Sequence, residues 1–481
     1  MTVQGKDAAA LALHRFGFGP MRDQLVVVAG DPRGAILADL DRPQAGSVAG
    51  ALPTSSEAAR AVFDFQAERQ AKQKLAQRLQ KQVDSDGTAP PSSQAVTAMS
   101  ADPLTGQKPT DNQPPLPQQL FLNEAKARVD AAIGADIGFV ERLVWFWSNH
   151  FCISAEKVVA MAGPYEREAI RPYVLGRFVD MLQAAESHPA MLVYLDNEQS
   201  MGADSIAGIN RDKGLNENLA REIMELHTLG VRSGYTQKDV TSLANVITGW
   251  TLIPPAQPDH GGEFAFAKRL HEPGDKIVLG KTYPDTGLGQ GRAVLADLAR
   301  HPATAQHVAE KLARHFVADV PPPTLVAKLE QTFKDSDGNL KELARTLVIA
   351  DESWAPQRGK LKPPSTWIVA VLRLAGPMAL PPNAIGRVTG AQAALGEALW
   401  RPPAPNGYPD TEAAWIDGVP HRLDIANEFA GRVAANADPQ ALLDAGLGPL
   451  ASAQTRQTVE RAESRAQALT LLVMAPEFLR S

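Results

Sequence analysis

The sequence predicts a mainly α-helical protein, a multi-helix globular bundle with one small β-hairpin. Apolar residues recur at three- and four-residue spacing in segment after segment, whereas sustained alternation of apolar and polar residues is scarce. The chain has 481 residues, of which 44% are hydrophobic and 21% charged, so it has an ordinary globular composition and can bury a large core. We therefore expect helix packing to hold the fold together.

The charge balance and the cysteine content exclude several classes of function. Lys and Arg number 48 against 54 Asp and Glu, which gives a net charge of −6 and predicts no nucleic-acid partner. Cys152 is the single cysteine of the sequence. Neither an intramolecular disulfide nor a thiolate-rich metal site can therefore form.

The lengths of the apolar runs indicate whether the chain crosses a membrane or carries an export signal. No run approaches the roughly 18 residues that a membrane span needs. The first residues do not combine a basic stretch with a long uncharged core, as a signal peptide does. We expect a soluble chain without a membrane span, cytoplasmic as written, and periplasmic or exported if a signal peptide has been removed.

The patterns divide the chain into four regions. Residues 1–83 supply N-terminal helices of the core, and residues 355–481 form a C-terminal helical subregion packed on it. Residues 84–117 hold seven prolines and no aromatic residue, which predicts a flexible insertion, either a mobile cover or an excursion without a role. Residues 118–354 form the main helical domain, which carries the polar segments.

Capping residues and apolar spacing predict the individual elements. Residues 55–83 begin with serine caps and become strongly charged, which indicates an outer helix with a wide solvated face. Further helices are predicted at 118–133, 137–150, 166–186, 216–229, 237–248, 292–300, 303–316, 324–333, 340–349, 366–374, 422–434 and 454–474. The segments 263–268 and 276–279 are predicted to pair as the hairpin, across the turn sequence HEPGD.

The densest polar segment spans residues 215–250. On a helical wheel of about 100° per residue, the core stripe consists of Leu219, Ile223, Leu226 and Gly230. One flank carries Asn218, Glu222 and Glu225, and Glu217 and Arg221 form an ion pair on the opposite face. Two carboxylates at i,i+3 can bind a hard cation or share one proton. The alternative is a solvated helix face whose charge Arg221 neutralises.

His227 lies on the other flank of the same predicted helix. It falls about 160° from Glu225, so a single regular helix cannot offer both side chains to one metal ion. Gly230 is placed to end the helix in a left-handed conformation, which leaves His227 in the last turn, where a protonated imidazole suits the helix dipole. Glu222, Glu225, Asp196 and His227 are nevertheless the candidate metal ligands.

The segment ERLVWFWSNHFCIS places a histidine at the end of an apolar row. Leu143, Phe146 and His150 share one helical face, so His150 is either a buried, hydrogen-bonded core residue or a ligand. Asn149 adds a second polar group beside it. Cys152 is expected to be a small buried filler, because nothing near it in sequence would lower its pKa.

Two further segments carry polar groups at the ends of elements. HPAMLVYLDN leads through apolar residues to Asp196 and Asn197, which are good ligands and also good helix stoppers. HEPGDK puts His271 and Lys276 around a tight turn, and turn chemistry alone does not call for the histidine. In HPATAQHVAEKLARHF, residues 307, 311 and 314 form a cationic strip that is expected to be a solvated face.

Taken together, these segments resemble the bacterial family DUF1800, a domain of unknown function. The resemblance rests on LHRFGFGP, FWSNHF, HPAMLVYLDN, NENLAREIMELHTLGVRSGYTQKDVTSLANVITGW, HEPGDK, HPATAQHVAEKLARHFV and KPPSTWIVAVLRLAG. It implies no particular reaction. Family members are often exported and encoded beside a sulfatase-like family, which implies a protein partner from a neighbouring gene. As written, this chain departs from that expectation in showing no signal-peptide pattern and in carrying the 84–117 insertion.

The family strings single out polar positions throughout the chain. They are Asn149, His150, Asp196, Asn197, Asn216, Glu217, Asn218, Arg221, Glu222, Glu225, His227, Tyr235, Asp239, His271, Asp275 and Lys276.

The leading hypothesis is an enzyme with a Glu/His/Asn/Asp site and metal-assisted or acid–base chemistry. The catalytic candidates are His150, Glu222, Glu225, Arg221 and His271, and the substrate-binding candidates are Asn149, Asn197, Asn216 and Lys276. The cofactor is unknown, with a divalent metal ion as the candidate.

Two rival hypotheses remain. In the first, the chain is a non-catalytic binding or maturation partner, and its polar cluster is a structural network that holds helices in register. In the second, a haem is ligated by His150 or His227, which predicts a strong visible absorption band.

Overall fold

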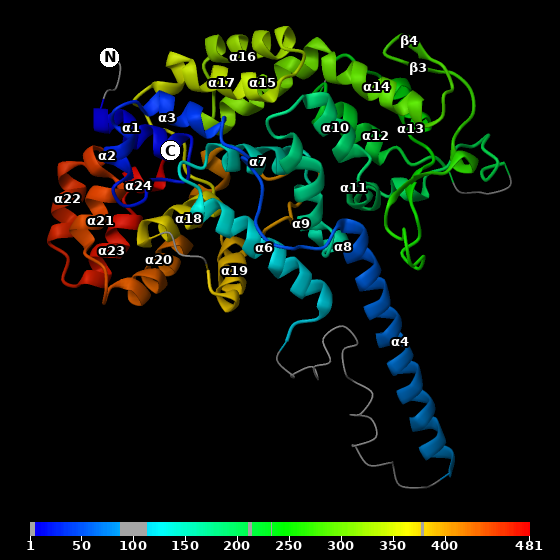
Figure 1. Ribbon diagram of the computed structural model, residues 1–481, viewed down its shortest axis with the longest axis horizontal. Coiled ribbons are helices and arrows are strands. Elements are labelled where there is room, and N and C mark those ends of the chain that lie inside the picture. Colours follow the sequence, from blue (N-terminus) through cyan, green and yellow to red (C-terminus); the bar gives the residue numbers. More distant parts are fainter. Residues whose placement is uncertain (1–4, 87–112, 210–213, 232, 377–379) are drawn as a thin grey trace.

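The computed structural model describes residues 5–86, 113–209, 214–231, 233–376 and 380–481, and it is mainly helical as predicted (Figure 1). Most of the predicted 84–117 insertion, residues 87–112, lies outside the described residues. In the described part of the chain, no helix is both long enough and apolar enough to cross a lipid bilayer.

Four helices precede the segment 87–112. They are α1 (Gly5–Arg15), α2 (Gln24–Val28), α3 (Pro32–Asp39) and α4 (Ser55–Asp86). Helix α1 is buried from Ala8 to Arg15, whereas α4 projects away from the body and is largely exposed (Figure 1). The prediction of a solvated outer helix over 55–83 is thus confirmed. The segment after α1 is a packed anchor, because Phe16 and Phe18 are completely buried.

The middle of the chain builds the region around the polar segments. Its α-helices are α6 (Leu116–Gly134), α7 (Phe139–His150), α8 (Ala155–Val158), α9 (Ala162–Tyr165), α10 (Phe178–Glu186), α11 (Pro189–Tyr194), α12 (Asn218–Glu222) and α13 (Gln237–Val246). Two π-helices accompany them, η1 (Glu166–Ile170) and η4 (Ile223–His227). The single helix predicted over 166–186 was wrong. It is interrupted by η1 and by a 3₁₀ turn at Pro172, whose ring removes a backbone N–H donor.

The second half of the chain is also helical. Its α-helices are α14 (Leu288–Arg300), α15 (Pro302–Phe316), α16 (Pro323–Asp335), α17 (Leu340–Ile349), α18 (Pro364–Ala375), α19 (Ile385–Ala394), α20 (Val419–Val433), α21 (Pro439–Gly446), α22 (Ala453–Glu460), α23 (Arg465–Val473) and α24 (Pro476–Leu479). The helix predicted over 454–474 is split, because the Ser464 side chain accepts a hydrogen bond from Gln467 N and begins a new helix there.

Short 3₁₀ helices connect many of these elements. They are η2 (Arg171–Tyr173), η3 (Asn197–Gln199), η5 (Lys268–Leu270), η6 (Asp351–Trp354), η7 (Pro382–Ala384), η8 (Glu412–Ala414), η9 (Ile416–Gly418) and η10 (Gly448–Leu450).

The two predicted strands are present as β2 and β3, but each pairs with a strand that was not predicted. Strand β2 (Phe264–Phe266) pairs antiparallel with β1 (Trp250–Leu252), and β3 (Lys276–Val278) pairs antiparallel with β4 (Lys281–Tyr283). The predicted hairpin between β2 and β3 was therefore wrong. The tight turn is formed by Leu279 and Gly280, both at positive φ, and not by HEPGD.

A contiguous hydrophobic core joins the N-terminal and C-terminal parts of the chain. It includes Leu11 of α1, Phe316 of α15, Trp367 of α18 and Leu472 of α23. Helix α1 packs beside the C-terminal helices (Figure 1), where His14 Nε2 lies 2.8 Å from the carbonyl oxygen of Gly446. The two sites described below are both embedded in this helical body.

Candidate functional site

The densest polar segment is not a regular helix. Helix α12 passes directly into the π-helix η4, in which each turn contains more residues than an α-turn. The predicted helical wheel holds for Leu219 and Ile223, which are completely buried, and departs from the structure after Ile223. Met224 and His227 are buried, whereas Leu226, which was predicted in the core stripe, is only half-buried. Gly230 does end the segment at φ 88°, as predicted.

Two histidines from other helices bind the end of this π-helix. His150, at the end of α7, donates Nε2–H to the carbonyl of His227 over 3.1 Å. His307, from α15, donates Nε2–H to the carbonyl of Leu226 over 3.0 Å. Burial lowers the pKa of His307 to about 4 and the pKa of His150 well below its usual value. Both rings are thus neutral donors near pH 7, as the core interpretation of His150 requires.

A buried histidine–glutamate pair lies at the same place. His227 Nδ1 is 2.7 Å from Glu186 Oε1, and the two side chains are 1% and 0% exposed. In the described part of the chain, neither His227 Nε2 nor Glu186 Oε2 has a hydrogen-bond partner. A carboxylate on Nδ1 keeps the proton there, so Nε2 carries the free lone pair.

Glu222 is half-buried and interacts electrostatically with this pair. Burial raises the pKa of Glu222, and the negative charges of Glu225 and Glu186 add to the increase, while His227 and Arg221 oppose it. Burial also raises the pKa of Tyr194, and the charge of Glu222 contributes to that increase. Glu222 therefore acts electrostatically on a tyrosine and on both members of the buried pair.

Glu225 has a tyrosine partner of its own. The pKa of Tyr235 is raised by burial and then by Glu225, which accepts the hydrogen bond of its hydroxyl. Asn218, predicted on the same flank, is exposed. The site thus contains two half-buried carboxylates without the asparagine that was expected to join them.

The predicted cationic strip is not wholly a solvated face. Lys311 of α15 is half-buried, and burial lowers its pKa to about 8. Its charge acts on His150, His307 and Cys152. Residues 307, 311 and 314 lie on one helix face as predicted, but that face is half-buried. Cys152 itself is buried, and burial raises the pKa of its thiol to about 12, as a buried filler requires.

Three of the predicted substrate-binding residues donate hydrogen bonds to backbone carbonyl groups. The amide of Asn197 donates to the carbonyls of Ile247 and Trp250, and that of Asn216 donates to those of Leu195 and Asp196. Lys276 donates its ammonium hydrogens to carbonyls of its own turn, at Pro273 and Gly274.

Three further predicted residues have partners away from the buried pair. Asp196 forms an ion pair with Lys157, and Arg221 pairs with Glu217 over 3.2 Å, as predicted. His271 Nδ1 lies 3.0 Å from the carbonyl of Thr248, and its Nε2 lies 3.6 Å from Asp285.

The structure therefore gathers four predicted residues and separates the others. His150, Glu222, Glu225 and His227 share one neighbourhood, reached from α7, α12 and η4. Among the residues that the structure describes, no three His, Cys, Asp or Glu side chains are arranged to hold a metal ion. The predicted ligand set of Glu222, Glu225, Asp196 and His227 thus has no geometric support in this part of the chain.

Glu186 was not among the predicted site residues. The sequence did contain a signal, because Leu182 and Glu186 are spaced i,i+4 at the end of the apolar face of α10, as Phe146 and His150 are in α7.

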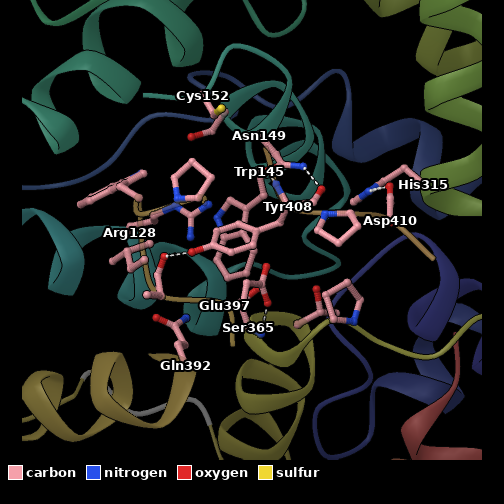
Figure 2. A pocket seen from close by; sticks show the side chains of 18 of the residues that line it. Arg128, Trp145, Asn149, Cys152, His315, Ser365, Gln392, Glu397, Tyr408 and Asp410 are labelled. Atoms are coloured by element: carbon pink, nitrogen blue, oxygen red, sulfur yellow. Dashed lines mark hydrogen bonds and ion pairs between the residues drawn. The ribbon is translucent and has the colours of Figure 1, made fainter. Parts of the chain in front are cut away.

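A pocket of about 80 Å³ lies apart from this pair, between α7, α18, α19 and the loop that follows α19 (Figure 2). Aromatic walls come from Trp145, Trp400, Tyr408 and Trp415, and polar lining groups include Arg142, Gln392 and Glu397. Asn149, a predicted substrate-binding residue, lines it and holds the loop by exchanging two hydrogen bonds with the backbone of Tyr408. Gln392 and Glu397 were not predicted, because no polar motif marks their segment.

The fold is that of a mainly helical protein, and it contains a buried histidine–carboxylate pair. The chain belongs to the DUF1800 family, described as a protein of unknown function, and it matches that family over residues 11–480. The match runs from α1 to the end of α24 and so includes both the buried pair and the pocket. No curated protein and no solved structure matches the chain.

Proposed function

We propose that this chain is an enzyme that performs acid–base chemistry with His227 as its proton-transferring group. The observation that carries the proposal is the buried Glu186–His227 pair, whose Nε2 has no hydrogen-bond partner among the described residues. A buried imidazole nitrogen without a partner costs free energy, and a substrate proton is a natural partner for it.

The pair contains the parts that a general base needs. Glu186 accepts the Nδ1 proton and so fixes the tautomer and the ring orientation. When Nε2 takes a proton from substrate, the carboxylate of Glu186 stabilises the imidazolium that forms. Glu222, whose pKa is raised, holds its proton to higher pH than an ordinary glutamate and serves as the acid that returns a proton.

The neighbouring residues position this chemistry. His150 and His307 fix the carbonyl groups at the end of η4 and thereby hold His227 against Glu186. Lys311 supplies positive charge on the same side and favours a substrate with an anionic group. Arg221, predicted as a catalytic residue, is engaged with Glu217 and Gln237.

The structural-network alternative also has a specific observation in its favour. His150, Asn197 and Asn216 all bind backbone carbonyls, as residues that hold elements in register do. In that case the chain acts by binding a partner, such as the product of a neighbouring gene, and performs no chemistry.

Substrate profiling distinguishes the enzyme proposal from the structural-network alternative. We would incubate purified protein with a metabolite extract, follow the extract by mass spectrometry, and compare wild type with His227→Gln and Glu186→Gln. The matched control is His260→Gln, because that histidine is exposed. We expect compounds that wild type and the control convert and that both site variants leave unchanged. Conversion by folded His227→Gln at the wild-type rate, or no conversion by wild type, contradicts the proposal.

Elemental analysis separates acid–base from metal-assisted chemistry. We expect purified wild type to contain no stoichiometric metal. A stoichiometric divalent metal that is lost in folded Glu222→Gln and Glu225→Gln would replace the acid–base mechanism with a metal-assisted one.

A further inference from the structure

The pocket in Figure 2 contains buried polar groups that the protein itself does not satisfy. Gln392 is completely buried, and both atoms of its amide have no hydrogen-bond partner in the described part of the chain. Trp415 is 5% exposed, and its indole N–H is likewise without a partner there. Unsatisfied buried polar groups are rare in folded proteins because each costs free energy. Three N–H donors and one carbonyl therefore remain free for a ligand.

The pocket wall also holds a buried cation that makes no direct ion pair with a carboxylate among the described residues. Arg142 is 2% exposed, and among the described residues its hydrogen bonds go to the carbonyl of Gly17 and to His315 Nε2, not to a carboxylate. Burial lowers its pKa to about 10, while the charges of Asp410 and Glu397 oppose that decrease, so the guanidinium stays charged near neutral pH. A buried charge of this kind is stabilised by an anion.

The other charged groups of the wall are already paired. Arg128 binds Glu166, and Asp410 binds His315 and Lys360. Glu397 accepts a hydrogen bond from Ser365 N, and burial raises its pKa. Arg142 is therefore the charged group of this wall that has no direct ionic partner among the described residues.

We infer that this pocket binds a small carboxylate. The volume of about 80 Å³ limits the ligand to a few heavy atoms, and the aromatic walls exclude bulk water from it. The carboxylate oxygens accept from the Gln392 amide and the Trp415 indole, and the negative charge offsets that of Arg142.

Isothermal titration calorimetry with the full chain tests this assignment. The probes are acetate, propionate and lactate, each compared with its own amide, which has a similar shape and no charge. We expect at least one carboxylate to bind, with an affinity about tenfold or more above that of its amide, because hydrogen bonds to a charged group are the stronger ones. Absence of binding by all three acids, or equal affinity of acid and amide, overturns the inference.

Variants locate the binding to the pocket. Gln392→Leu keeps the side-chain size and removes the amide, and we expect it to weaken binding about tenfold or more. Gln454→Leu, on the exposed surface of α22, is the matched control and should bind as wild type does. Trp415→Phe, which removes the indole N–H and keeps an aromatic ring, is a second variant in case Gln392→Leu does not fold. Wild-type affinity in the folded Gln392 or Trp415 variant overturns the assignment.

The inference does not depend on the proposed function. His227 does not line the pocket, so His227→Gln should bind the carboxylate with wild-type affinity while it loses activity.

Discussion

At the scale of single residues, the completely buried Glu186 and His227 depend on each other. Glu186→Ala leaves the Nδ1 proton of His227 without an acceptor, whereas Glu186→Gln keeps a carbonyl oxygen at that place. We expect Glu186→Ala to lower the free energy of unfolding by about 1–3 kcal/mol and Glu186→Gln to lower it less. Urea denaturation of wild type, Glu186→Ala and Glu186→Gln measures these free energies of unfolding. Equal stability of wild type and Glu186→Ala would mean that the pair is not formed.

In contrast to Glu186, replacement of Gln392 is expected to increase the free energy of unfolding. Its amide is buried without a partner among the described residues, so Gln392→Leu removes an unfavourable group. We expect this variant to gain on the order of 1 kcal/mol of stability. The measurement is the melting temperature without added ligand, with Gln454→Leu as the unchanged control. A clear loss of stability would show that the amide has an intramolecular role.

Buried neutral histidines make stability depend on pH. His307 titrates at about 4 in the folded chain and near 6.5 when unfolded, so the unfolded state binds more protons between these values. Stability that is fully present above the unfolded pKa is therefore lost as the pH falls through that window. We expect His307→Gln to show a smaller slope of unfolding free energy against pH between 6.5 and 5. An unchanged slope would indicate that His307 is not buried in its neutral form.

At the scale of elements, the π-helix η4 determines where His227 points. Its turn is closed by Thr228, whose hydroxyl donates to the carbonyl of Ile223 over 2.6 Å. Helices that contain a π turn are less regular than the α-helix that the sequence pattern predicts, and they occur frequently at functional sites. The loss of this turn would rotate His227 away from Glu186.

Thr228→Val tests this contribution, because valine has nearly the same shape without the hydroxyl. We expect a loss of about 1 kcal/mol together with lower activity. Thr458→Val is the control, since Thr458 makes the same kind of bond to Gln454 O on an exposed helix and should cost much less. Similar effects in the two variants would argue against a special role for η4.

The helices that sequence predicts well are those with an uninterrupted apolar face and clear ends. Residues 340–349 are an example, because Asn339 caps the helix and the apolar positions repeat regularly. The π-helix was not predictable in this way, because it is supported by His150 and His307 from distant parts of the chain. The prediction of the partner of β2 was also wrong. Its partner β1 lies earlier in the chain, across a long connection.

At the scale of the whole molecule, the candidate site was predictable only in part. The motifs identified His150, Glu222, Glu225 and His227, which the fold brings together. Glu186 completes the site from α10, and no local pattern shows which carboxylate will meet a given histidine across the core. The pocket could not be predicted, because Gln392 and Trp415 become neighbours only after α19 and the following loop pack against α7 and α18.

The central claim is that Glu186 holds His227 with a free Nε2. The most direct measurement is the ¹⁵N NMR spectrum of protein labelled at its ten histidines, recorded under mildly alkaline conditions and assigned by comparison with His227→Gln. We predict that His227 carries its proton on Nδ1 and leaves Nε2 unprotonated. A His227 ring protonated on Nε2 instead would contradict both the pair and the chemistry proposed for it.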